Sequence, residues 1–251
     1  MDEHQSEENL SEEDKERDVP AKWRRKSLKQ IFSRPNIIRV VNMIVCGIAF
    51  AALWIAFFLT LAGVIEDPYN RMFSYAACSL LMLAPFIIEM IFGIKLSDFI
   101  LTFFVLYALL AGVLGAGFAL YRIVPYFDKA VHTLFGYVGC IVGLLIVCKL
   151  SDYKRLNPLF VVIVCFAVSL ACGACWEIME FTADMFFGQT AQGLPVTTVD
   201  GKTVVDRLDT MLDIICNFCG AILFIIHYIV HVLTRRNLVM GSIIRDLNRK
   251  D

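Results

Sequence analysis

The chain has 251 residues, of which 58% are apolar and 19% charged, and its formal net charge is −1. Soluble domains usually have about 45–50% apolar and about 25% charged residues, and the apolar excess here lies in blocks of about 20 residues or more, the length that spans a bilayer. These values exclude a soluble enzyme, a nucleic-acid-binding protein and a secreted disulfide scaffold.

The first 36 residues divide into two segments of opposite charge. Residues 1–19 are acidic and have no apolar period, so we predict a disordered acidic leader. Residues 20–36 are basic with apolar residues interleaved, which predicts a basic juxtamembrane segment. This segment either forms a short amphipathic helix on an anionic membrane surface or is a solvated flank that fixes the topology.

Six apolar segments follow and predict an all-α, polytopic membrane protein with six transmembrane helices over residues 37–233. Gly139 and Gly143 form a GxxxG pair in the fourth segment, and Gly112, Gly115 and Gly117 lie in the third; both sets favour close helix packing. The expected spans, separated by turn signals, are residues 37–65, 72–94, 97–121, 128–150, 158–187 and 206–233.

The lysine and arginine residues predict the orientation. The basic leader segment, Lys95, the loop at residues 149–155 and a tail at residues 234–251 fall on one side of the membrane and carry most of the positive charge. Because positive loops stay inside, both termini are predicted to be cytoplasmic in a multi-pass protein of the cell membrane. The longest outer connection, residues 188–205, contains a Val199-Asp200-Gly201-Lys202 turn that predicts a short hairpin.

Polar residues collect on the last three predicted helices. Spacings of three and four place each set on one helical face, and the predicted orientation places all three sets in the outer half of the membrane. The sets are Asp128 and His132 in the fourth span, Glu177, Glu180 and Asp184 in the fifth, and Asp209, Asp213 and Asn217 in the sixth.

Six carboxylates at one membrane depth cannot all remain ionised and unpaired. One ionised carboxylate at the middle of a helix costs about 2.5–3.5 kcal/mol on insertion scales, and neighbouring like charges add to that cost. A bound metal ion, trapped protons or the cations Arg122, Lys129 and Arg207 must therefore compensate. Alternatively, the same residues form a satisfied network of hydrogen bonds and salt bridges between helices.

These residues, taken in order, form a recognisable series of motifs. The series reads Asp128-Lys129-x-x-His132-x-x-x-Gly136, then Trp176-Glu177-x-x-Glu180, then Asp209-Thr210-x-x-Asp213-x-x-x-Asn217-x-x-Gly220-Ala221. It resembles the YjdF-type bacterial inner-membrane proteins and, more distantly, the VanZ-like family, which has a carboxamide where this chain has Glu180. The resemblance implies a polytopic bacterial protein of the cell envelope and brings no settled activity.

All nine cysteines fall within apolar segments, which predicts small packing residues and no disulfide framework. The CxxC pairs Cys172–Cys175 and Cys216–Cys219 lie on consecutive antiparallel helices, where four thiolates are an alternative zinc or iron–sulfur site. His227, His231 and Glu89 lie towards the inner ends of their helices. They are interpreted as interfacial anchors, with a proton or metal relay as the alternative.

Three functions follow from these patterns. The first is a site for an envelope lipid headgroup, or a lipid-linked substrate, that uses Mg²⁺, Mn²⁺ or Zn²⁺. The second is a proton- or cation-coupled transporter, and the third is a non-enzymatic membrane scaffold. The expected partners are membrane lipids and not nucleic acid. In the first function, His132 is a general base or ligand oriented by Asp128, Asn217 gives polar support, and the metal ligands are Glu177, Glu180, Asp184, Asp209 and Asp213.

Overall fold

The computed structural model confirms an all-α protein with six helices long and apolar enough to cross a membrane. The acidic leader, nearly all of the basic segment and most of the tail lie outside the residues it describes. Those residues are 35–68, 71–188, 191–192, 196–197, 203–204, 207–234, 240–241 and 243–244.

The observed elements match the expected spans to within a few residues, apart from the third. A two-residue antiparallel pairing of Val196 with Val204 and Thr197 with Thr203 confirms the predicted hairpin. In chain order the elements are α3 (Ile37–Leu61), α4 (Met72–Phe92), α5 (Asp98–Ala108), η2 (Leu109–Gly117), α6 (Leu120–Ile123), α7 (Phe127–Leu150), η3 (Tyr153–Arg155), α8 (Pro158–Phe187), β1 (Val196–Thr197), β2 (Thr203–Val204) and α9 (Arg207–Thr234).

Local sequence signals set several helix ends. The side chains of Asn36, Ser97 and Asn157 accept hydrogen bonds from backbone N–H groups in the first turns of α3, α5 and α8, which satisfies donors that have no partner inside a helix. Gly93 and Gly188 end α4 and α8 in the left-handed conformation that glycine adopts without steric cost.

The third span departs from the continuous helix expected over residues 97–121. Its last nine residues, Leu109–Gly117, form a π-helix, and the chain then reverses at Ala119, which has a φ of 59°. This stretch contains Gly112, Gly115 and Gly117, and glycine inside a helix weakens the regular α-helical conformation because its backbone loses more conformational freedom than that of other residues. A Cβ at Gly115 would lie 2.5 Å from the ring of Tyr121, so this glycine makes room for the Tyr121 side chain.

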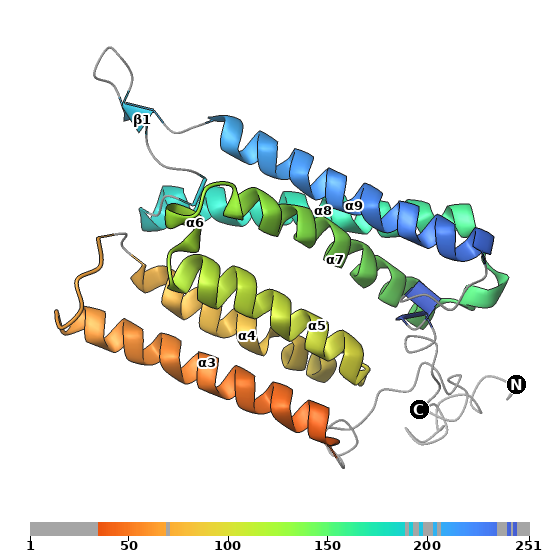
Figure 1. Cartoon of the computed structure of the whole chain (residues 1–251), viewed down its shortest axis with the longest axis horizontal. Coiled ribbons are helices and arrows are strands. Elements are labelled where there is room, and N and C mark those ends of the chain that lie inside the picture. The colour runs from red at the N-terminus through yellow and green to blue at the C-terminus, as the bar shows by residue number, and fades with distance from the viewer. Residues whose placement is uncertain are drawn as a thin grey trace, which may run out of the picture.

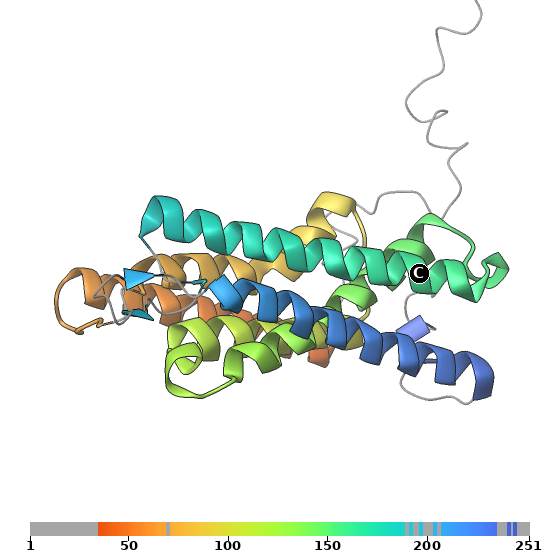
Figure 2. The same cartoon turned by 90° about the horizontal axis from the view of Figure 1, so that it is seen from above.

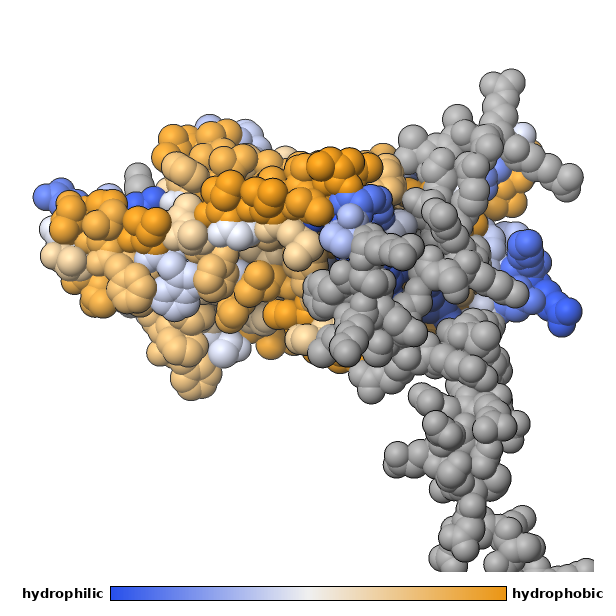
Figure 3. All heavy atoms as spheres, turned by 90° about the horizontal axis from the view of Figure 1, so that it is seen from below, coloured by the Kyte–Doolittle hydropathy of each residue, from blue (hydrophilic) through white to orange (hydrophobic). Residues whose placement is uncertain are grey.

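The helices form two groups, which Figure 1 shows one above the other. The first comprises α3, α4 and α5 with η2, and the second comprises α7, α8 and α9. Of the six spans, α7 has the largest buried share, and it packs against both α8 and α9. Figure 2 gives the view at right angles, in which the long helices run along one common direction. The face shown in Figure 3 is largely apolar along the middle of the bundle, as expected for contact with lipid.

Glycines bring the backbones of α7 and α9 into direct contact. A Cβ at Gly220 would lie 1.8 Å from the carbonyl oxygen of Thr133, and a Cβ at Gly136 would lie 1.9 Å from that of Asn217. No side-chain rearrangement relieves such an overlap, because the obstructing atoms belong to the backbone. The two motif glycines therefore fix the distance between α7 and α9.

The predicted GxxxG pair packs α7 against α8. A Cβ at Gly139 would lie 2.9 Å from the Cα of Ser169, and a Cβ at Gly143 would lie 2.6 Å from the Cα of Cys165. The role in close helix packing inferred from the sequence is thus confirmed for this pair.

A buried ion pair joins the helices of the first group at the end of the bundle where α3 begins and α4 ends. The Arg39 guanidinium, 1% exposed, pairs with both carboxylate oxygens of Glu89, which is 0% exposed. Glu89 also accepts the Leu96 N–H at 2.7 Å, while Arg39 donates to the Leu96 carbonyl at 3.2 Å. Glu89 is therefore a structural anchor, and its partner Arg39 was not expected from the sequence.

Candidate functional site

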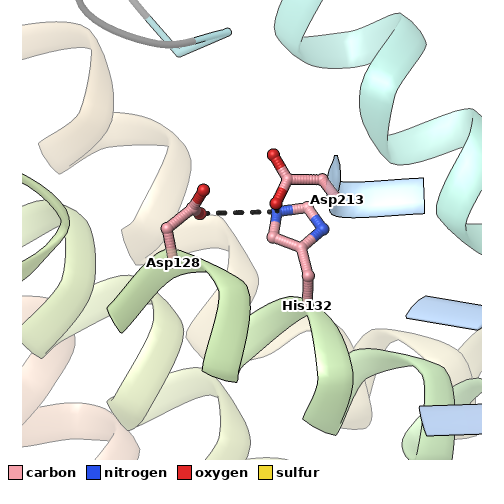
Figure 4. Close-up of side chains that lie close together, drawn as sticks. All are labelled: Asp128, His132 and Asp213. Carbon is pink, nitrogen blue, oxygen red and sulfur yellow. Dashed lines mark ion pairs between the residues drawn. The ribbon is translucent and has the colours of Figure 1, made fainter. Parts of the chain in front are cut away.

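The candidate site lies at the opposite end of the bundle, where α7 and α9 begin and α8 ends. Asp128 and His132 stand one turn apart on α7, and Asp213 of α9 faces them (Figure 4). The His132 Nε2 lies 3.5 Å from Asp128 Oδ1 and 3.9 Å from Asp213 Oδ1. One potential ligand atom from each residue lies within 4.8 Å of the others. The structure therefore brings these three residues, predicted from the sequence as part of one site, close to one another.

Lys129 connects the acidic residues of α7 and α9. Its Nζ lies 2.9 Å from Asp128 Oδ2, 2.5 Å from Asp209 Oδ1 and 2.8 Å from Asp213 Oδ1. Among the cations that the sequence offered as compensation, Lys129 thus has this role, while the Arg207 side chain lies outside the described residues. The Lys129 side chain is 20% exposed.

Glu177 of α8 is the fourth carboxylate of the site. It is 7% exposed, and its Oε1 lies 3.7 Å from His132 Nδ1. Neither of its carboxylate oxygens has a hydrogen-bond partner among the described residues. The Thr210 hydroxyl of α9 lies near this carboxylate as a weak hydrogen-bond donor that does not meet strict hydrogen-bond geometry. A buried carboxylate without such partners is costly and therefore uncommon.

Two further predicted metal ligands on α8 have other partners. Glu180 Oε1 accepts a hydrogen bond from Trp176 Nε1 at 2.7 Å. Asp184 accepts backbone N–H groups from Ala191 at 2.6 Å and from Gln192 at 3.0 Å. The structure therefore does not bring the whole predicted ligand set together, because the Asp184 carboxylate binds the backbone of the connection between α8 and α9 instead.

Replacing Asp184 with alanine tests this separate role. The loss of two hydrogen bonds to a carboxylate should ease local opening of the connection by about 1–2 kcal/mol. Limited proteolysis between α8 and α9 should then be about tenfold faster, provided that opening is rapid relative to cleavage. An unchanged cleavage rate would contradict the assigned role.

Asn217 supports the site from one turn further along α9. Its Nδ2 donates to the carbonyl oxygen of Ser169 at 3.3 Å, and the Ser169 hydroxyl donates to the carbonyl oxygen of Gly136 at 2.7 Å. A Cβ at Gly173 would lie 2.6 Å from Asn217 Nδ2, so this glycine makes room for the amide. These contacts connect α7, α8 and α9 one helical turn further into the bundle than Asp213.

The cysteine and histidine alternatives have structural explanations. All nine cysteines are free thiols. Among the described residues, the four CxxC cysteines do not form a group close enough to hold one metal ion. His227 Nδ1 lies 2.7 Å from the hydroxyl of Tyr137, which gives this imidazole a hydrogen-bonding partner between α7 and α9.

A cavity of about 970 Å³ adjoins the carboxylates. Asp128, Lys129 and Asp209 form part of its wall, together with Glu180 and Tyr121. Burial raises the pKa of the Tyr121 phenol well above its ordinary value, so this group stays neutral beside the acidic residues.

The comparisons with known proteins give a single kind of match. The sequence model of a family described as "Predicted membrane protein (DUF2238)" matches residues 46–233. The matched region runs from within α3 to near the end of α9 and includes every residue of the site. No curated protein and no solved structure matches the chain.

Proposed function

The chain belongs to the DUF2238 family of predicted membrane proteins, which is also the family of the YjdF-type proteins that its motifs resemble, and from its site we propose that it binds a divalent cation. This cation lies among α7, α8 and α9 and binds the phosphate of a membrane-lipid headgroup. The family description names no activity, so the support comes from the residues themselves.

The observation that carries the proposal is the imbalance of charge around His132. Among the described residues, Asp128, Asp209 and Asp213 share one ammonium group, that of Lys129, and Glu177 is buried next to the imidazole without a hydrogen bond of regular geometry. Burying a charge is strongly unfavourable unless it is paired or binds a metal ion. A divalent cation supplies the positive charge that this group lacks.

The types and spacing of the ligands suit such an ion. Two carboxylates and one imidazole are ligands that Mg²⁺, Mn²⁺ and Zn²⁺ accept. Bonds of about 2.0–2.2 Å to one ion place opposite ligand atoms up to about 4.4 Å apart, and the atoms of Asp128, His132 and Asp213 already lie within 4.8 Å of one another. Small side-chain rotations are therefore sufficient.

A lipid phosphate is the proposed second ligand because the protein offers few ligands. Mg²⁺ is usually held by one or two carboxylates and completes its coordination with water and phosphate oxygens. The cavity next to Asp128 gives a phosphate group access to the open side of the ion. The bound ion would provide the counter-charge for that phosphate.

One observation favours the second candidate, a scaffold without a ligand. Lys129 already pairs with the carboxylates that the cation needs, so a salt-bridged network alone could lock α7 to α9. The two functions make opposite predictions for Lys129, since an ammonium group competes with a bound cation but is essential to a network.

Binding of Mn²⁺ to the purified protein, followed by electron paramagnetic resonance, tests the proposal. We expect one ion per chain, with affinity reduced about tenfold or more by Asp213→Asn and by His132→Ala, because each removes a ligand. Lys129→Met should strengthen Mn²⁺ binding, since the competing charge is gone. Asp184→Asn is the matched control, and it should leave the affinity unchanged.

Absence of Mn²⁺ binding to the natural protein would contradict the cation site. Weaker Mn²⁺ binding by Lys129→Met than by the natural protein would also contradict it. A lower melting temperature of Lys129→Met, without any Mn²⁺ bound in either protein, would identify the scaffold.

A further inference from the structure

The cavity beside the site lies where the two groups of helices do not pack closely. The helix α4 packs on α3 and the third span, whereas α8 packs on α7 and α9. Between α4 and α8 the cavity reaches about 970 Å³, near the upper end of the range for sites that enclose small ligands. Both helices are candidate membrane spans, so the cavity lies at a depth where lipid surrounds the protein.

The walls of this cavity are predominantly apolar. Ala77, Leu81 and Ala84 of α4 face Ile178 and Met179 of α8 across it. The alanines leave room that larger side chains would fill. Ile178 and Met179 are each more than half exposed, which shows that this wall is open to the surroundings of the bundle.

One region of the cavity is charged. Asp128, Lys129 and Asp209 belong to the proposed cation site and also line the cavity, while Arg71 lines it from the start of α4. The Arg71 guanidinium pairs with Asp67 at 2.7 Å and donates to the Gly117 carbonyl at 2.9 Å. The cavity is therefore apolar over most of its wall and carries charged groups of both signs at one end.

Aromatic side chains link the two helices at the charged end. The rings of Phe73, at the start of α4, and Phe187, at the end of α8, stack with centroids 4.7 Å apart. Both residues also line the cavity. This stack joins α4 to α8 near their ends, whereas Leu80 and Ile178, further along the same helices, are exposed. Access from the side, between the two helices, is the route that these contacts leave.

We propose that this cavity holds one acyl chain of a membrane phospholipid, which enters sideways from the bilayer between α4 and α8. The phosphate then lies next to Asp128, Lys129 and Asp209. An apolar chamber with one charged end matches an amphiphile, and phospholipid is the amphiphile that surrounds two membrane spans. This assignment rests on the proposed function for the position of the headgroup, but the acyl-chain site is tested separately.

The test uses the full chain in phosphatidylcholine nanodiscs that contain a phosphatidylglycerol with a photoreactive diazirine in its acyl chain. After illumination, mass spectrometry locates the labelled peptides. We expect labelling concentrated at residues 77–84 and 178–187, and suppressed by excess unlabelled phosphatidylglycerol. Ala77→Trp and Ala84→Trp, made separately, should each reduce it about tenfold, since an indole projecting from α4 occupies part of the space in which the acyl chain would lie. Ala51→Trp, on the exposed side of α3, is the matched control and should not.

Labelling spread evenly over the lipid-facing helices would overturn the proposal. Labelling that persists in both tryptophan variants would overturn it as well, provided that size-exclusion chromatography shows them folded. Mn²⁺ binding measured on the same samples separates the two proposals. If Mn²⁺ binds while residues 77–84 and 178–187 are not labelled preferentially, the acyl-chain site is wrong and the cation site stands; specific labelling without Mn²⁺ binding gives the reverse result.

Discussion

Replacing Arg39 with methionine is expected to destabilise the protein by about 3–5 kcal/mol, because it leaves the carboxylate of Glu89 buried without its counter-ion. Both side chains are almost completely enclosed, so water cannot substitute for the missing guanidinium. The measurement is thermal or denaturant unfolding of the purified protein in detergent. The control is Arg155→Met, since Arg155 is 88% exposed, and loss of its surface pair should change stability by less than about 1 kcal/mol.

The double variant Arg39→Met/Glu89→Met shows whether the destabilisation comes from an uncompensated charge. Removing both charges should recover a large part of the stability lost in the single variant, because two apolar side chains of similar size bury at little cost. If the double variant is as unstable as the sum of both single variants, the hydrogen bonds to Leu96 are the dominant contribution instead.

The substitution Gly220→Ala is expected to destabilise the protein by about 3 kcal/mol or more, at or above the upper end for overpacked cores. The new methyl group would lie 1.8 Å from the Thr133 carbonyl oxygen, so α9 must move away from α7. The same movement pulls Asp213 away from Lys129, and Mn²⁺ binding should weaken along with stability. Unfolding in detergent and Mn²⁺ titration measure the two effects.

Gly47→Ala is the matched control for this substitution. Gly47 also lies inside a membrane helix, but a Cβ there meets no atom within 4 Å. Alanine should therefore be tolerated and should stabilise α3 by about 0.5–1 kcal/mol, because it restricts the unfolded backbone and favours the helix. Equal destabilisation by Gly47→Ala and Gly220→Ala would show that the contact between α7 and α9 is not the cause.

Most of the fold could be predicted from the sequence because membrane spans are long, apolar and bounded by strong turn signals. The fourth and fifth spans agree with α7 and α8 to within one residue at each end. The π-helix at Leu109–Gly117 could not be predicted in this way, since hydropathy does not depend on winding. The cytoplasmic location of both termini, the disordered leader and the likeness to VanZ-like proteins stay predictions.

The candidate site could be predicted only in part. Helical spacing placed Asp128 and His132 on one face of α7, and the order of the spans placed Asp213 of α9 at the same end of the bundle, where the structure brings the three residues together. Helical spacing could not show that Asp184 lies apart from the other predicted ligands. Its carboxylate accepts a hydrogen bond from the backbone N–H of Ala191, and that contact depends on the path of a connecting loop. Arg39 was missed because one arginine at the start of an apolar helix resembles an ordinary topology signal.

The contact of α7 with α9 through Gly136 and Gly220 has a consequence for recognising relatives of this protein. Because neither glycine has a Cβ, α7 and α9 can approach closely enough to bring the acidic side chains next to the imidazole of His132. A chain that retains all the ionisable positions but has a bulkier residue at either glycine would be unable to assemble the same pocket. We therefore expect relatives that keep the acidic residues to keep glycine at both positions as well.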